Sequence, residues 1–270
     1  MSETPVILIE NSSKARELLV CTPSWIAYGH VRTGSTMVFN LLRILANPLT
    51  DQSISAWEGN FASPEKFIEL IEESQGIRNG VLKIHRNHEA LNRRLRTKQD
   101  KAVLTDRSMR NSCYPYWRML NSAASPFYQE HPELSLPEKF LQDEIRHCQA
   151  KAAQPSTLII SEEQIRNNTE EAIQLITMFL GLSIHPESIR FLAKYLSFSR
   201  LAKLANTGAN NRYTTGHERV TFLHPDHIST QGSVNHCSDE VKHEIERLLQ
   251  APAQIHLDEN ACILPRSKQC

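Results

Sequence analysis

Residues 25–42, WIAYGHVRTGSTMVFNLL, decide the fold of this chain. An apolar run is followed by a basic residue, a glycine and hydroxyl-bearing residues, and then by apolar residues at helical spacing. The pattern predicts a buried strand, a tight turn and a helix that carries Ser35 and Thr36 in its first turn. Free N–H groups at a helix N-terminus favour a bound anion, and the guanidinium of Arg32 suits phosphate or sulfate oxygens. The stretch therefore predicts an anion-binding loop, although an ordinary strand–glycine–helix turn has the same pattern.

This loop differs from a Walker A loop, because the Gly-x-x-x-x-Gly-Lys-Ser/Thr spacing is absent. It resembles the 5′-phosphosulfate loop of the sulfotransferases, whose usual form is Lys/Arg-Ser/Thr-Gly-Ser/Thr-Thr. The matching residues are Arg32, Thr33, Gly34, Ser35 and Thr36. The resemblance implies that they bind the 5′-phosphosulfate end of 3′-phosphoadenylyl sulfate (PAPS), the sulfate donor of that family.

The composition of the 270-residue chain is that of an ordinary globular protein, with 40% hydrophobic residues. This length suits one large α/β domain spanning residues 1–270. Basic and acidic residues balance at 30 each, which disfavours nucleic acid as a partner. No apolar run has the length of a membrane span, no signal-peptide pattern is seen, and the six cysteines form no CxxC pair. We therefore expect a cytoplasmic protein with reduced thiols and no membrane association.

Short strands alternate with longer helices along the chain. Beyond the strand that opens at Trp25, strands are predicted at residues 80–85, 101–106 and 156–161. Helices are predicted at residues 35–46, 65–74, 136–152, 169–181, 186–205 and 238–250. The alternation predicts an α/β fold with a central parallel sheet of about four or five strands, flanked by helices on both faces. Ligands of such sheets bind at the carboxyl ends of the strands.

Titratable side chains lie at or just after the carboxyl ends of the predicted strands, in residues 30–32, His85, Arg107 and Glu162. Lys83 and His85 are two residues apart on a strand, so both should point to the same side, toward the anion loop. His85 could accept a proton from an attacking hydroxyl, and Lys83 could stabilise negative charge on the transferred and leaving groups. An edge lysine beside a solvated histidine is the alternative. The Lys-x-His spacing also resembles the cytosolic sulfotransferases, where it supplies a charge stabiliser and a base.

Residues 103–117 resemble the 3′-phosphate segment of the same family. Arg107 stands where the family has its phosphate-binding arginine, whereas Pro115 replaces the family's serine. Because proline is tolerated only in the first turn of a helix, we expect a helix to start near Ser112. Ser112 and Arg110 would then be further phosphate contacts. Surface ion pairs are the alternative explanation for Arg107 and Arg110.

Two later stretches extend the resemblance. Residues 157–182 resemble the family's strand–YEDL–helix–FLGL module, with Ser161 in place of a tyrosine that helps to hold adenine. Residues 227–232, ending at Gly232, are similar to the C-terminal cofactor loop but lack its usual Arg-Lys pair. This resemblance makes Gly232 a candidate cofactor-binding residue.

The resemblance spans residues 25–250 in the family's order and implies a P-loop-like sulfotransferase architecture. It implies an enzyme that moves a sulfuryl group from PAPS to a hydroxyl of a small-molecule or carbohydrate-like acceptor, through an in-line, loosely bonded transition state. Lys83 and Ser35 would stabilise the leaving oxygen, and His85 would take the acceptor's proton. The alternatives are a P-loop-type kinase that uses ATP and a catalytically silent nucleotide- or anion-binding module. Met37, in place of the usual adenine-stacking tryptophan, favours the silent module.

A metal site is not expected. The pairs His85/His88 and His224/His227 have a His-x-x-His spacing, but no complementary set of cysteines or carboxylates accompanies them.

Overall fold

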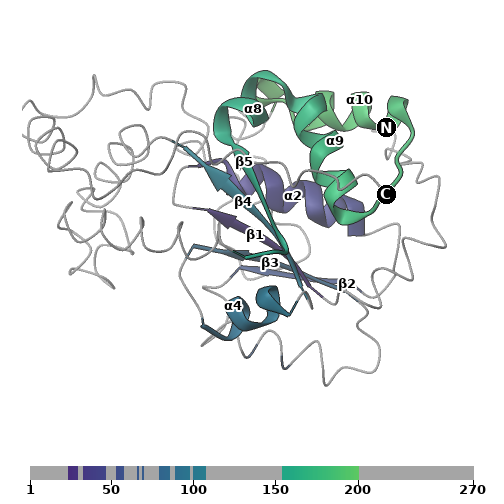
Figure 1. Ribbon diagram of the computed structural model, residues 1–270. Coiled ribbons are helices and arrows are strands. Elements are labelled where there is room, and N and C mark those ends of the chain that lie inside the picture. The colour runs from purple at the N-terminus through teal and green to yellow at the C-terminus, as the bar shows by residue number, and fades with distance from the viewer. Residues whose placement is uncertain are drawn as a thin grey trace, which may run out of the picture.

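The computed structural model describes residues 24–29, 33–46, 53–57, 66, 69, 79–85, 89–97, 100–107 and 154–200. Its centre is a five-stranded sheet of order β2-β3-β1-β4-β5, in which all neighbours are parallel (Figure 1). The strands are β1 (Ser24–Gly29), β2 (Ser53–Trp57), β3 (Asn79–Ile84), β4 (Lys101–Asp106) and β5 (Thr157–Ser161). The helices are α2 (Ser35–Ala46), α4 (Glu89–Arg96), α8 (Glu162–Asn167), α9 (Thr169–Leu180) and α10 (Pro186–Tyr195).

Helices cover both faces of the sheet. In Figure 1, α2, α8, α9 and α10 lie on one face and α4 lies on the other. This arrangement confirms the predicted α/β fold with a parallel sheet flanked on both faces. Within the described segments, no helix has the length and apolar character that a membrane span requires. A single domain over residues 1–270 stays a prediction.

Successive side chains of each strand enter opposite cores, because a strand points alternate residues to opposite faces. Val81 of β3 and Val103 of β4 pack in the core shared with α2, and the residues that follow them pack in the core shared with α4. Buried apolar residues on both faces are typical of parallel strands covered by helices. By the same alternation, Lys83 and Thr105 belong to the face that carries α2.

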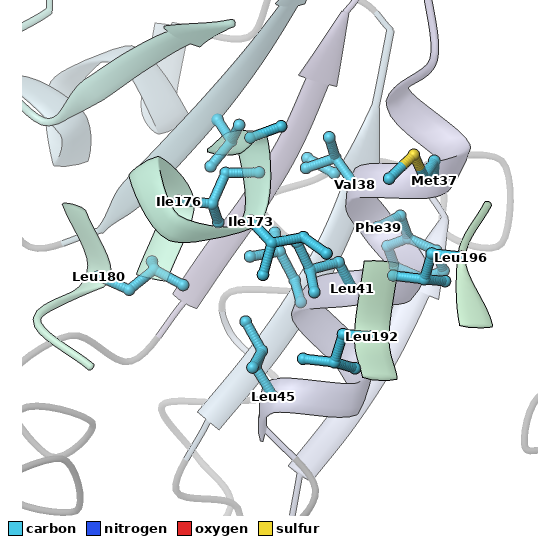
Figure 2. Close-up of a cluster of buried hydrophobic side chains, with 14 of the residues drawn as sticks. Met37, Val38, Phe39, Leu41, Leu45, Ile173, Ile176, Leu180, Leu192 and Leu196 are labelled. Carbon is cyan, nitrogen blue, oxygen red and sulfur yellow. The ribbon is translucent and has the colours of Figure 1, made fainter. Parts of the chain in front are cut away.

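The larger core lies between the sheet and helices α2, α9 and α10 (Figure 2). Phe39, Leu41 and Leu45 of α2 are buried there together with Ile173 and Ile176 of α9. Burial of each such side chain stabilises the fold by roughly 1.5–3 kcal/mol. The apolar stripe of α2 therefore fixes this helix on the sheet, and with it the position of the helix N-terminus.

The predicted strands and two of the predicted helices are confirmed. The strands correspond to β1, β3, β4 and β5, and the helices at residues 35–46 and 169–181 correspond to α2 and α9. The sequence does not predict β2, because Ser-Ile-Ser-Ala-Trp is short and rich in small polar residues, and it needs only one partner at the edge of the sheet. The helices predicted at residues 65–74, 136–152 and 238–250 lie outside the described residues, apart from residues 66 and 69.

The helix predicted over residues 186–205 is not continuous: α10 ends at Tyr195, residues 198–200 are helical again, and residues 201–205 lie outside the described residues. Leu196 closes α10, with its N–H directed to the carbonyls of the last turn and backbone angles of −94° and 7°. Ser197 follows in non-helical backbone, and serine side chains compete with the backbone for hydrogen bonds inside a helix.

We predict that Leu41→Ala lowers the free energy of unfolding by about 2–5 kcal/mol, because it leaves a cavity under α2. Met178→Ala is the matched control on α9, since Met178 is 73% exposed, and it should change stability by no more than about 0.5 kcal/mol. Urea titrations of both variants measure the difference. Equal effects would contradict the placement of α2 on the sheet.

Candidate functional site

The chain turns at Gly34 after β1 and enters α2 at Ser35. Gly34 has a φ of 93°, a left-handed conformation that favours glycine. The N–H groups of Met37 and Val38 donate to the Gly34 carbonyl at 2.9 and 3.4 Å, so the helical ladder starts there. The N–H groups of the first turn lack an earlier helical carbonyl, and the helix dipole adds to their positive potential. The predicted strand–turn–helix is therefore confirmed.

This helix start lies at the point of the sheet where the chain changes direction. After β1 the chain forms β2 and β3 on one side, and it then crosses to β4 on the other side of β1. Ligands of open α/β sheets bind in the crevice at such a switch point, outside the carboxyl ends of the strands. The topology thus points to the same place as the helix N-terminus.

Lys83 brings a positive charge to the start of α2. Its Nζ donates to Thr36 Oγ1 at 2.8 Å, and the residue is only 5% exposed. An ammonium group and the positive end of a helix dipole repel each other, and burial of the charge adds to the cost. An anion bound beside both would offset this cost, so the arrangement suits a phosphate or sulfate group. The structure brings Lys83 to the anion loop, as the strand alternation predicts.

The ring of His85 is oriented by the end of β1. Its Nδ1 lies 2.7 Å from the carbonyl oxygen of Gly29. A carbonyl can only accept, so Nδ1 carries the proton and donates it. In the neutral imidazole, Nε2 then holds a lone pair and can accept a proton. Lys83 and His85 thus reach the same edge of the sheet, one at the helix start and the other at the last residue of β1.

A pair of buried hydroxyls fastens the turn to β4. Thr33 Oγ1 lies 2.8 Å from Thr105 Oγ1, and Thr105 Oγ1 donates to the Tyr28 carbonyl at 3.3 Å. Both threonines are fully buried. The hydroxyl of Thr33 is therefore directed inward, and its backbone N–H is the group through which it can take part in anion binding.

Arg107 is connected to the anion loop through Glu162. Its Nε lies 3.9 Å from Glu162 Oε2, and a Cβ placed on Gly34 would lie 3.6 Å from Glu162 Cγ. Burial lowers the pKa of Arg107, whereas the nearby Glu162 charge raises it. A guanidinium nevertheless stays protonated, and its fork of five N–H donors suits the oxygens of a phosphate. The alternative of an ion pair is present, but it is not on the surface, since the two side chains are 19% and 15% exposed.

Ser161 starts α8 and so places Glu162. The Ser161 hydroxyl accepts from the Gln164 N–H at 3.0 Å, while the Gln164 side chain accepts from the Ser161 N–H at 3.1 Å. This capping box is readable in the sequence as Ser-x-x-Gln. Glu162 also pairs with Arg166, whose Nε donates to Oε1 at 2.8 Å. The position that the resemblance assigns to an adenine contact therefore has a structural role here.

Several predicted site residues lie outside the described residues and stay predictions. They are Arg32, Arg110, Ser112 and Gly232. The sequence does not place Gly29 or Thr105 in the site. Thr105 could have been found as the one hydroxyl residue of the apolar strand β4, since it lies two positions before Arg107 and so on the same face of the strand as Arg107. Among the described residues, no cluster of three or more His, Cys, Asp or Glu side chains could hold a metal ion.

Neither a family model nor a curated protein matches this sequence. Solved structures do. The chain superposes on a mouse sulfotransferase, SULT7A1, complexed with PAP, with a TM-score of 0.56 and 16% identity over 88% of each chain. The chain has a sulfotransferase-type fold.

Retinol dehydratase is a second solved neighbour, represented by two complexes. With androsterone and the inactive cofactor PAP, the TM-score is 0.51 at 17% identity, covering 88% of this chain and 84% of that one. With retinol and PAP, the values are 0.52 and 16%, covering 89% and 85%. At identities this low, the structural likeness shows the fold alone. It confirms the P-loop-like fold that the sequence predicts.

We predict that Gly34→Ala and Gly181→Ala destabilise the protein similarly, by roughly 1–2 kcal/mol each, because both glycines have left-handed φ values, 93° and 82°. Only Gly34→Ala should weaken binding of inorganic pyrophosphate, by about tenfold, since Gly181 closes α9 away from the anion loop. Thermal unfolding with and without pyrophosphate measures both effects. Equal loss of pyrophosphate binding in the two variants would contradict an anion site at Gly34.

Proposed function

We propose that this protein transfers a sulfuryl group from PAPS to a hydroxyl of a small-molecule or carbohydrate-like acceptor. The observation that carries the proposal is the Lys83–Thr36 hydrogen bond, which holds a buried ammonium at the N-terminus of α2. The histidine oriented by Gly29 adds a base at the same edge. Solved neighbours of this fold contain PAP, which is PAPS without its sulfuryl group, and one also contains androsterone or retinol.

The residues present fit the two ends of such a nucleotide. The backbone N–H groups of Gly34, Ser35 and Thr36 would bind the 5′-phosphosulfate, with Arg32 beside them. Arg107 would bind the 3′-phosphate; its Nε lies 3.9 Å from Glu162 Oε2, and its guanidinium suits phosphate oxygens. PAPS supplies the group that is transferred, and no metal is required to polarise it in this scheme.

In the transfer, the acceptor oxygen forms a bond to sulfur while the bond from sulfur to the phosphate oxygen breaks. The acceptor's proton moves to Nε2 of His85, the nitrogen that the Gly29 carbonyl leaves unprotonated. The bridging oxygen keeps the electron pair, and Lys83 and Ser35 stabilise its developing charge. By analogy with phosphoryl transfer, an in-line, loosely bonded transition state requires positioning and charge stabilisation more than covalent chemistry.

A catalytically silent nucleotide-binding module is the second candidate. It is favoured by Ser161, which caps α8 where the resemblance would place an adenine contact. Such a module would bind the same nucleotide but would gain nothing from an oriented histidine. The two predictions below separate the candidates.

We predict that adenosine 3′,5′-bisphosphate binds at least about tenfold more tightly than AMP, because a charge-assisted hydrogen bond to a phosphate contributes roughly 1.5–3 kcal/mol. Arg107→Met should abolish the difference. Arg190→Met is the matched control, since Arg190 is exposed on α10 and pairs with Glu187. Calorimetric titration gives the affinities. Equal affinity of the unmodified protein for both nucleotides would remove the sulfotransferase proposal.

We also predict that His85→Ala lowers turnover by about 10²–10⁴-fold while bisphosphate affinity stays within about twofold, because only proton removal is lost. Lys83→Met should lower turnover as well. His185→Ala is the control, since His185 caps the N-terminus of α10. Steroid, retinoid and sugar alcohols, tested with labelled PAPS, serve as acceptors. Normal turnover in His85→Ala would exclude His85 as the base, and tight nucleotide binding without transfer to any acceptor would favour the silent module.

A further inference from the structure

The carboxyl end of β1 is the point where the anion loop and the histidine meet. Thr33 follows this end, Thr105 comes from the neighbouring strand β4, and His85 comes from β3 on the other side. Gly29 pairs with Thr105 in the sheet register. Groups from both neighbouring strands therefore converge on the last two residues of the central strand.

The two threonine hydroxyls and the backbone of β1 form one hydrogen-bonded unit. Thr33 Oγ1 lies 2.8 Å from Thr105 Oγ1, and Thr105 Oγ1 lies 3.3 Å from the Tyr28 carbonyl, which can only accept. Both threonines are fully buried, where an unsatisfied hydroxyl is costly and a satisfied one specifies a single arrangement.

Gly29 makes this arrangement possible. A Cβ at Gly29 would lie 2.1 Å from Thr105 Oγ1 and 2.5 Å from Thr33 Oγ1, so the hydroxyl pair occupies the space of the missing side chain. The carbonyl of the same glycine accepts from His85 Nδ1 at 2.7 Å. Displacement of Thr105 would therefore shift Thr33 in the turn before α2. It would also shift the Gly29 carbonyl, which accepts the hydrogen bond from His85.

We propose that Thr105 is a positioning residue of the site: through Thr33 it fixes the anion loop over β1, and through the Tyr28 and Gly29 backbone it fixes the carbonyl that orients His85. The proposal rests on the function proposed above. Valine fills almost the same volume as threonine and suits a strand, so Thr105→Val removes the hydroxyl with little change of packing.

The test compares Thr105→Val and Thr105→Ser with Thr177→Val. Thr177 is a buried threonine of α9 whose hydroxyl donates to the Gln174 carbonyl at 2.9 Å, so its valine variant reports the loss of an ordinary buried hydrogen bond. Three quantities are measured in the full chain: melting temperature, hydrogen–deuterium exchange of amides 33–36, and affinity for adenosine 3′,5′-bisphosphate.

In Thr105→Val we expect exchange of amides 33–36 to rise by about fivefold and nucleotide affinity to fall by about the same factor. Thr105→Ser, which keeps the hydroxyl, should restore both. Thr177→Val should lower the melting temperature and leave the exchange and the affinity unchanged. In a cycle with Thr33→Val, the losses of affinity should not add, because the two hydroxyls act as one unit.

If Thr105→Val changes only the melting temperature, as Thr177→Val does, or if serine fails to restore the exchange rates, Thr105 is not a positioning residue. Failure of the proposed function has a different signature, namely a native protein that does not prefer the bisphosphate to AMP. In that case the exchange of amides 33–36 still decides whether Thr105 fixes the loop.

Discussion

The close approach of the Thr33 and Thr105 hydroxyls to the backbone of Gly29 is the constraint on which the rest of the site depends. No side chain fits there, since Thr33 and Thr105 fill the space above the backbone. This allows the chain to turn back over β1 and begin α2 directly at the carboxyl end of the sheet. The apolar stripe of α2 holds the helix in place, so its N-terminus stays at the carboxyl end of the sheet, where the strand order changes direction between β1 and β4.

Around this point the fold gathers positive potential. The start of α2 contributes free N–H groups, Lys83 contributes a buried ammonium, and Arg107 a largely buried guanidinium. Glu162 is the carboxylate that the described structure pairs with Arg107, and it sits beside Gly34. In the proposed function, a bound phosphosulfate and a 3′-phosphate would place negative charge beside these cations.

Much of the fold and part of the site could be predicted from the sequence, because both follow from local periodicity. The strand and helix around the anion loop, and the shared face of Lys83 and His85, need only the repeat of a strand and the spacing of a helix. The Thr33–Thr105 bond joins residues 72 positions apart, and it depends on which strands are neighbours and in what register. The edge strand β2 was not predicted, because its five residues, Ser-Ile-Ser-Ala-Trp, form too short an apolar run to indicate a strand.

The most direct test of the central claim is a crystal structure of the protein with adenosine 3′,5′-bisphosphate. The account predicts that the 5′-phosphate accepts from the N–H groups of Gly34, Ser35 and Thr36, within reach of Lys83 Nζ, and that the 3′-phosphate contacts Arg107. A nucleotide bound away from the N-terminus of α2, or one whose 3′-phosphate does not approach Arg107, would contradict it.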